Sequence, residues 1–174
     1  MELKVRTFVK VLLVDDEPEF GAILSQRLSK RRYSVSTARS GEDALAQLEQ
    51  DKNIEVVILD VKMPGLDGIE TLKFIKKKWP LVEVIMLTGH STLNSAIDSI
   101  KLGAYDFLLK PTDIGQLIAK LDKAAHRKRH RDKLILEVYM TPYITQRERE
   151  RMISGILDPA TQGSVIEVDA HEEF

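Results

Sequence analysis

The chain has 174 residues and is 43% hydrophobic, which is enough for one domain of ordinary size with an appendage. Its 26 Lys and Arg residues nearly balance its 27 Asp and Glu residues, so no overall charge indicates nucleic acid or a membrane surface as a partner. There is no cysteine, which excludes disulfides and thiol catalysis, and no apolar run approaches the roughly 20 residues of a membrane span. Because charged residues stand near Met1 in place of a secretory apolar core, we expect a cytoplasmic protein.

Short runs of apolar and β-branched residues recur along the chain, and each stops at polar or turn-forming residues. Such runs are typical of β-strands in a buried sheet, although the second alternates only weakly. In chain order the predicted strands cover residues 8–14, 33–38, 54–59, 82–87 and 104–109.

Each predicted strand is followed by a segment whose apolar residues recur at helical spacing. Pro18 suits the first turn of the first helix, and Pro80 stops the third. Gly103 ends the fourth helix in a left-handed conformation, and Asp113 with Gln116 resembles a capping box that opens the fifth.

Strands that alternate with helices through short connections indicate a doubly wound parallel sheet with helices on both faces. Right-handed crossovers then bring the carboxyl ends of all strands to one edge, where ligands bind in open α/β sheets. The residues that end four of these strands are polar or charged, and they would meet in one crevice. They are Asp15, Asp16, Asp60, Thr88 and Lys110.

Together these five residues favour a phosphoryl site. Three carboxylates in one cleft repel one another unless a cation joins them, and an all-oxygen set without His or Cys suits Mg²⁺. Mg²⁺ also binds phosphate oxygens, for which Thr88 offers a hydroxyl and Lys110 a positive charge. Asp60 is the candidate nucleophile, because carboxylates form acyl phosphates. In the plainer alternatives Asp60 caps a helix or turn and Lys110 only neutralises buried acids.

Four motifs occur in order along the chain. They are Leu-Val-Asp-Asp-Glu-Pro at residues 13–18, Leu-Asp-Val-Lys-Met-Pro-Gly-Leu-Asp-Gly at 59–68, Leu-Thr-Gly at 87–89 and Gly-Ala-Tyr-Asp-Phe-Leu-Leu-Lys-Pro at 103–111. Together they closely resemble the CheY-like receiver domain of two-component response regulators, over about residues 8–126. The resemblance implies a five-stranded sheet of order 2-1-3-4-5.

By position, the resemblance implies that Asp60 is the phosphoacceptor and that Thr88 and Lys110 bind the phosphoryl group. It also implies a cis bond between Lys110 and Pro111, which is an uncommon state. The implied Mg²⁺ ligands are Asp15, Asp16, Asp60 and the main-chain carbonyl of Lys62.

The resemblance further implies that Phe107 is a switch aromatic, with Tyr105 as its neighbour on the same strand face. Thr88 would take part in the same switch. Lys62 and His90 would flank the route of the attacking water, where the family sets the lifetime of the phosphate.

The implied protein is a signalling phosphoacceptor and not an enzyme beyond Mg²⁺-dependent self-phosphorylation and self-dephosphorylation. Its partners would be a sensor histidine kinase or a phosphotransfer protein, and a downstream protein target. One alternative is the receiver part of a transcriptional regulator. An aspartyl-nucleophile phosphatase would carry its nucleophile after the first strand with a second acid two residues on, whereas Asp15 and Asp16 are adjacent. A flavin-binding domain would need a first loop rich in Gly, Ser and Thr.

Residues 127–174 are predicted to form a helical C-terminal extension with an acidic end. A basic run at residues 126–131 breaks the apolar stripe, and Pro142 precedes a further short helix. Residues 144–150 faintly resemble the start of a helix-turn-helix output domain, but no second apolar helix follows, so no nucleic-acid partner is expected. The uncovered apolar residues and the opposite charges of its two ends predict docking on its own receiver or on a second copy, as a homodimer.

Overall fold

The computed structural model describes residues 8–89 and 93–158. His90, which was expected to flank the water route, and the acidic end from residue 159 lie outside this range. The chain divides into two compact units between residues 128 and 129, and each unit is described by itself. The first unit carries the β-sheet, and the described part of the second is helical.

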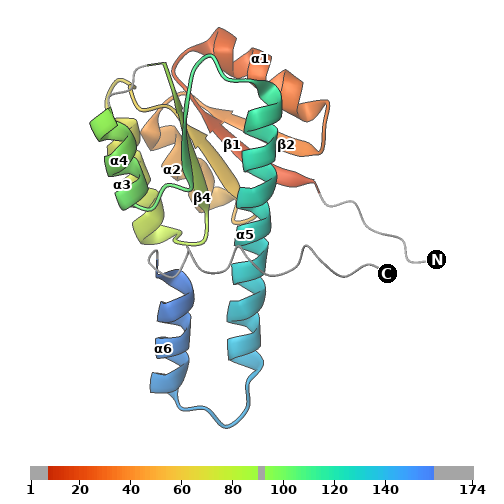
Figure 1. Cartoon of the computed structure of the whole chain (residues 1–174), viewed down its shortest axis with the longest axis vertical. Coiled ribbons are helices and arrows are strands. Elements are labelled where there is room, and N and C mark those ends of the chain that lie inside the picture. Colours follow the sequence, from red (N-terminus) through yellow and green to blue (C-terminus); the bar gives the residue numbers. More distant parts are fainter. Residues whose placement is uncertain (1–7, 90–92, 159–174) are drawn as a thin grey trace, which may run out of the picture. The chain divides into compact units, whose positions relative to one another are not determined.

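Five parallel strands form one sheet, with helices packed around it (Figure 1). The strand order is β2-β1-β3-β4-β5, which confirms the predicted order. The register aligns Val14 of β1 with Leu59 of β3, and Leu59 with Met86 of β4. The carboxyl ends of the central strands therefore lie at one edge. The strands are β1 (Val9–Val14), β2 (Tyr33–Ala38), β3 (Val56–Leu59), β4 (Glu83–Thr88) and β5 (Asp106–Leu109).

The helices agree with the predicted segments, and the fifth is much longer than its apolar stripe indicated. It continues through the basic run because Lys and Arg are good helix formers and because Ala125, just before the run, and Arg131, at its end, are buried. None of the helices in the described ranges has the length and hydropathy needed to cross a membrane. The helices are α1 (Pro18–Ser29), α2 (Gly41–Gln50), α3 (Gly68–Lys78), α4 (Leu93–Lys101), α5 (Ile114–Met140) and α6 (Gln146–Leu157).

The apolar residues of the strands alternate between two cores, one on each face of the sheet. On β1, Val11 and Leu13 join the core beneath α1 and α5, whereas Leu12 and Val14 join the core beneath α2 and α3. Every residue of β3 and β4 is buried, as in the central strands of a parallel sheet. Helices therefore cover both faces, and the doubly wound prediction is confirmed.

Local signals set several helix ends. Asp67 caps α3 in a complete capping box. At the start of α5, Asp113 accepts a hydrogen bond from the Gln116 amide (3.0 Å), but the Gln116 side chain accepts from Thr112 (3.3 Å), so the predicted box is only half formed. Gly103 has a φ of 96°, the left-handed conformation predicted for the end of α4.

The prediction that Tyr105 and Phe107 share a strand face is wrong. β5 begins at Asp106, and Phe107 packs against the core beneath α2 and α3. Tyr105 precedes the strand and packs against the other core, with the guanidinium carbon of Arg127 4.4 Å from its ring centre. Side chains alternate strictly only within an extended strand, so a residue one step outside it can turn to the other face.

Candidate functional site

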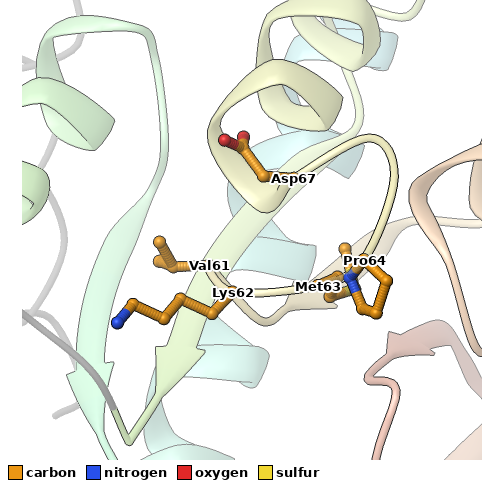
Figure 2. Close-up of a pocket in the computed structure, with 5 residues that line it drawn as sticks. All are labelled: Val61, Lys62, Met63, Pro64 and Asp67. Atoms are coloured by element: carbon orange, nitrogen blue, oxygen red, sulfur yellow. The ribbon is translucent and has the colours of Figure 1, made fainter.

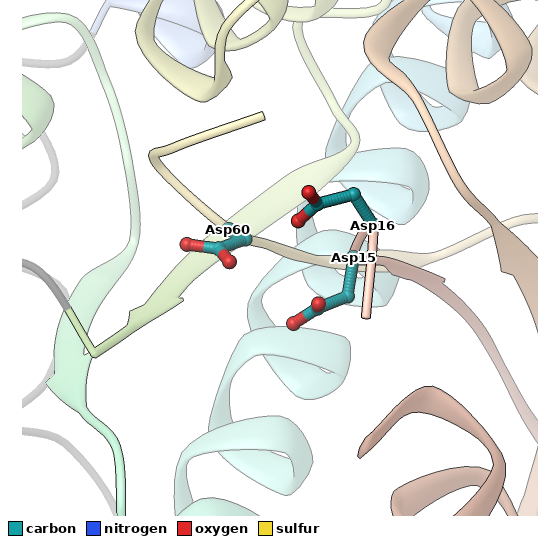
Figure 3. A group of neighbouring side chains, drawn as sticks. All are labelled: Asp15, Asp16 and Asp60. Atoms are coloured by element: carbon teal, nitrogen blue, oxygen red, sulfur yellow. The ribbon is translucent and has the colours of Figure 1, made fainter. Parts of the chain in front are cut away.

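Three carboxylates meet at the carboxyl edge of the sheet (Figure 3). Asp15 and Asp16 directly follow β1, and Asp60 directly follows β3, which is next to β1 in the sheet. One oxygen from each carboxylate lies within 4.8 Å of the others, although Asp15 and Asp60 expose only 4% and 5% of their surface. The structure thus brings together the three acids that the sequence placed at two strand ends.

Main-chain hydrogen bonds hold the two buried acids in place. The Asp15 amide donates to a carbonyl of β2 (3.1 Å) and the Asp60 amide to a carbonyl of β1 (3.0 Å), so the hydrogen-bonded ladder extends one residue beyond each strand. The turns that follow orient the carboxylates, because Oδ1 of Asp15 accepts from the Glu17 amide (2.9 Å) and Oδ1 of Asp60 from the Lys62 amide (3.3 Å). The second oxygen of each acid is left for Lys110.

The Lys110 ammonium lies among these acids. Its Nζ is 2.5 Å from Oδ2 of Asp15, 3.4 Å from Oδ2 of Asp60 and 3.5 Å from Oε1 of Glu17. The same nitrogen lies 3.9 Å from the centre of the Phe20 ring, a distance at which a cation is attracted to the ring face. Lys110 therefore partly neutralises the acidic cluster.

Thr88 and Lys110 are placed next to each other by the main chain. Thr88 is the last residue of β4 and is completely buried, and its carbonyl accepts a hydrogen bond from the Lys110 amide (2.8 Å). A cis peptide bond joins Lys110 to Pro111, as the resemblance implied. The ends of β4 and β5 thus bring a hydroxyl-bearing residue and an ammonium to the edge that holds the acids.

Burial and ion pairing shift the pKa values of Asp15 and Lys110. Burial raises the pKa of the Asp15 carboxyl above its ordinary value of 3.8, and the hydrogen bond from Lys110 only partly opposes it. Burial alone would lower the pKa of the Lys110 ammonium, but its hydrogen bond to Asp15 and the charges of Asp15, Asp60 and Glu17 outweigh it, so the net shift is upward. Lys110 is therefore charged at neutral pH. Further positive charge nearby would stabilise the ionised form of Asp15.

The loop after Asp60 is held by close packing against Gly68. A Cβ atom at Gly68 would lie 1.9 Å from the Asp60 carbonyl oxygen, and the Gly68 amide donates to the Val61 carbonyl (2.8 Å). Only glycine lets α3 begin this close to the Asp60 backbone. The loop borders an open pocket, shown in Figure 2, which is lined by Val61, Lys62, Met63, Pro64 and Asp67.

Sequence reasoning gave no role to three residues around this site: Glu17, Phe20 and Gly68. Glu17 belongs to the same acidic run as Asp15, so a signal for it was present. Phe20 was interpreted only as an apolar residue of a helix, because nothing local shows that its ring lies under an ammonium from residue 110. Two further residues that the resemblance implied for the site, Phe107 and Lys62 through its main chain, also lie within the described residues. Phe107 is partly buried there.

Comparison with known proteins identifies the same region of the chain. The family model described as the response regulator receiver domain matches residues 11–122. The chain is 39% identical over 125 residues to the transcriptional regulatory protein ZraR of Salmonella typhimurium. This alignment covers 71% of this chain and 28% of that protein. The chain is 37% identical over 123 residues to the nitrogen assimilation regulatory protein NtrX of Azorhizobium caulinodans, covering 70% of this chain and 27% of that protein. The chain thus spans less than a third of the length of these curated relatives.

Solved structures resemble the same part of the chain. A response regulator receiver domain protein from Clostridium thermocellum superposes with a TM-score of 0.68 at 36% identity, covering 70% of this chain and 98% of that one. The receiver domain of NtrX from Brucella abortus superposes with a TM-score of 0.63 at 34% identity, covering 67% of this chain and 98% of that one. The family-model match, the shared fold and the acidic cluster agree: the chain belongs to the response regulator receiver domain family.

Proposed function

We propose that Asp60 accepts a phosphoryl group and that the chain signals in its phosphorylated form. The observation that carries the proposal is the Lys110 ammonium, which lies 2.5 Å from Asp15 and 3.4 Å from Asp60 beside three clustered carboxylates. A cation in that place can bind the oxygens of a phosphoryl group carried on Asp60. Receivers are not by themselves a family of enzymes, so family membership favours a signalling phosphoacceptor over an aspartyl phosphatase.

The donor set at the sheet edge fits Mg²⁺. Every donor is an oxygen, and the carboxylate oxygens are close enough, within 4.8 Å, to share one hard cation. When bound, Mg²⁺ would offset the charge of the acids and of the phosphoryl oxygens. A second positive charge would also stabilise the ionised form of Asp15, because burial raises the pKa of that carboxyl. The proposed ligands are Asp15, Asp16, Asp60 and the main-chain carbonyl of Lys62.

The proposed transfer needs neither a redox partner nor a separate nucleophile. The ionised carboxylate of Asp60 attacks the phosphorus, a phosphorus–oxygen bond forms, and the donor leaves with the electron pair of the bond that breaks. The Lys110 ammonium and the Thr88 hydroxyl bind the phosphoryl oxygens and orient the group toward Asp60. Attack by water on the acyl phosphate releases phosphate and restores the carboxylate, so the chain would also dephosphorylate itself.

The proposed phosphodonor is a sensor histidine kinase or a phosphotransfer protein, and the proposed compartment is the cytoplasm. We divide the chain into a receiver at residues 8–126 and an extension at residues 127–174, with Phe107 as the switch that changes the contacts of the receiver with a downstream protein. The receiver part of a transcriptional regulator is a second candidate. It is favoured because the matched ZraR is a transcriptional regulatory protein, of which this chain spans 28%.

The test is phosphorylation by acetyl phosphate, followed by mass spectrometry of the intact protein. We expect one phosphoryl group on the wild type in the presence of Mg²⁺ and none on Asp60→Asn, because the amide keeps the shape but loses the nucleophile. Asp67→Asn is the matched control, since Asp67 lies in the same loop but caps α3. Undiminished labelling of Asp60→Asn, or labelling that survives EDTA, would overturn the proposal.

A further inference from the structure

The helical unit after residue 128 has an inner face that its own two helices cover. On α5, Arg131 and Val138 expose only 5% of their surface each. The Nε of Arg131 donates a hydrogen bond to the carbonyl of Ile156 in the last turn of α6 (3.2 Å), where a cation also complements the helix dipole. Nearer the connection, the guanidinium of Arg149 on α6 lies 5.9 Å from the ring centre of Tyr139. The two helices form a hairpin.

The same stretch of α5 carries a second apolar stripe that the described part of the chain leaves largely exposed, although the Arg149 guanidinium lies against one side of Tyr139. Leu136, Tyr139 and Met140 follow one another at helical spacing and are 60%, 61% and 75% exposed. Leu136 lies two positions before Val138, and Tyr139 and Met140 lie one and two positions after it; because successive positions on a helix are turned by about 100°, all three point away from the inner face. A helix with apolar stripes on two sides is typical of a bundle in which it has more than one neighbour.

The connection between the helices extends this stripe. Tyr143 is fully exposed and has a φ of 62°. A left-handed conformation is uncommon for a residue with a bulky side chain, and such outliers persist where the surrounding structure requires them. Tyrosine is also one of the residue types enriched at the hot spots of protein interfaces. The tip of the hairpin thus presents an aromatic side chain to solvent on a constrained backbone.

We infer that two copies of the chain associate through this hairpin, each contributing α5 and α6 to a four-helix bundle. The three residues of the exposed stripe and Tyr143 are each at least 60% exposed, and a stable monomer rarely leaves such a cluster of large apolar side chains uncovered; Met152 on α6 adds a further side chain that is 46% exposed. A two-helix hairpin has too small a core of its own, and a second copy supplies the missing helices.

The charges beside the stripe favour a second copy over a partner of one charge. Lys133 and Glu137 flank Leu136, lie 3.8 Å apart, and have side chains that are 74% and 58% exposed. In a two-fold arrangement that brings the two Leu136 side chains together, Lys133 of each copy can approach Glu137 of the other. An entirely acidic partner would repel Glu137, and an entirely basic partner would repel Lys133.

The absence of cysteine allows a direct test by cross-linking. Single cysteines are introduced at 136, 139 or 140 of the full chain, and the control is Phe74→Cys on α3, where the native side chain is similarly exposed at 52%. Under mild oxidation we expect at least one hairpin variant to form a disulfide-linked dimer much faster than the control. Equal rates at all four positions would overturn the inference, because they would reflect random collision.

Sedimentation equilibrium of the cysteine-free chain provides the second measurement. We expect a reversible dimer at concentrations up to about 100 μM, and a dissociation constant at least about tenfold higher for Leu136→Glu with Tyr139→Glu. Ile100→Glu on α4, where the side chain is 48% exposed, is the matched control and should leave the dimer unchanged. Circular dichroism checks that each variant is folded.

Three outcomes would overturn the inference: a monomeric wild type, a dimer that persists in the hairpin variant, or a dimer that only Ile100→Glu disrupts. A monomer that binds only lipid vesicles or a different protein counts as the first of these. The measurements are made without Mg²⁺ or phosphodonor and are repeated in Asp60→Asn. Their result therefore does not depend on the proposed phosphorylation.

Discussion

Replacement of Lys110 by methionine should produce a protein whose stability depends strongly on the charge of its acids. Methionine keeps an unbranched apolar side chain but removes the ammonium that bonds Asp15 at 2.5 Å and lies 3.4 Å from Asp60. Removing one partner of a buried ion pair costs about 3–5 kcal/mol, because the other charge stays buried and unpaired. Since the Lys110 side chain is 12% exposed and its third partner, Glu17, is 67% exposed, we expect the lower end of that range. A loss of about 3 kcal/mol at pH 7 corresponds to roughly 10 °C in Tm.

The dependence on pH separates this effect from a simple packing defect. Pairing raises the pKa of Lys110 above its ordinary 10.5, so its contribution to stability is complete at neutral pH and is lost only as the pH rises through its folded-state value. Burial raises the pKa of Asp15, so the folded variant takes up a proton there more readily than the unfolded chain does. The deficit of Lys110→Met should therefore shrink as the pH falls toward about 4.

Urea unfolding followed by circular dichroism measures both effects. The double variant Lys110→Met with Asp15→Asn should recover part of the lost free energy of unfolding, because the buried charge that Lys110 bonded most closely is gone, while Asp60 stays buried without the ammonium. Phe20→Leu is the control for the loss of the cation–π contact, since it removes the ring 3.9 Å from Nζ and leaves the acids paired. A buried ion pair at Lys110 is refuted if Lys110→Met is as stable as the wild type at pH 7. It is also refuted if neither a fall in pH toward about 4 nor the added Asp15→Asn substitution reduces the loss of unfolding free energy.

Three further predictions follow from buried groups. Asp15→Asn should raise Tm at pH 7 without Mg²⁺, because it removes a carboxylate whose pKa is raised by burial while Lys110 keeps Asp60 and Glu17 as partners; the gain should vanish as the pH falls through the raised pKa of Asp15, which thermal scans across that range would show. Gly68→Ala should cost about 1–3 kcal/mol in urea unfolding and slow the labelling of Asp60, because its Cβ would lie 1.9 Å from the Asp60 carbonyl; Gly21→Ala, with open space around it, should not destabilise. Arg127→Met should cost about 3 kcal/mol in the same assay, because it removes the guanidinium paired with the fully buried Glu83; an unchanged midpoint would contradict this.

The sequence by itself determined the architecture and the identity of the residues at the sheet edge. Alternating strand and helix patterns with short connections leave few topologies, and parallel strands must share one carboxyl edge. Asp15, Asp60 and Lys110 could therefore be placed together although 95 residues separate the first from the last. Helix ends with strong local signals, such as the glycine at 103, were equally readable because the signal and the structure lie within the same few residues.

Only the tertiary structure decided which atoms around those residues touch. Phe20 lies against the Lys110 ammonium because β1, which precedes α1, and β5 come to the same edge of the sheet, although 90 residues separate the two side chains. Gly68 is only eight residues from Asp60, but the close approach of its backbone to the Asp60 carbonyl depends on how the loop between them folds back. Tyr105 turned to the opposite core from Phe107 because β5 begins one residue after it. The second stripe of α5 likewise reads as ordinary apolar helix in the sequence. Its exposure is decided by which face α6 occupies, because a helical pattern shows that residues share a face and does not show what covers that face.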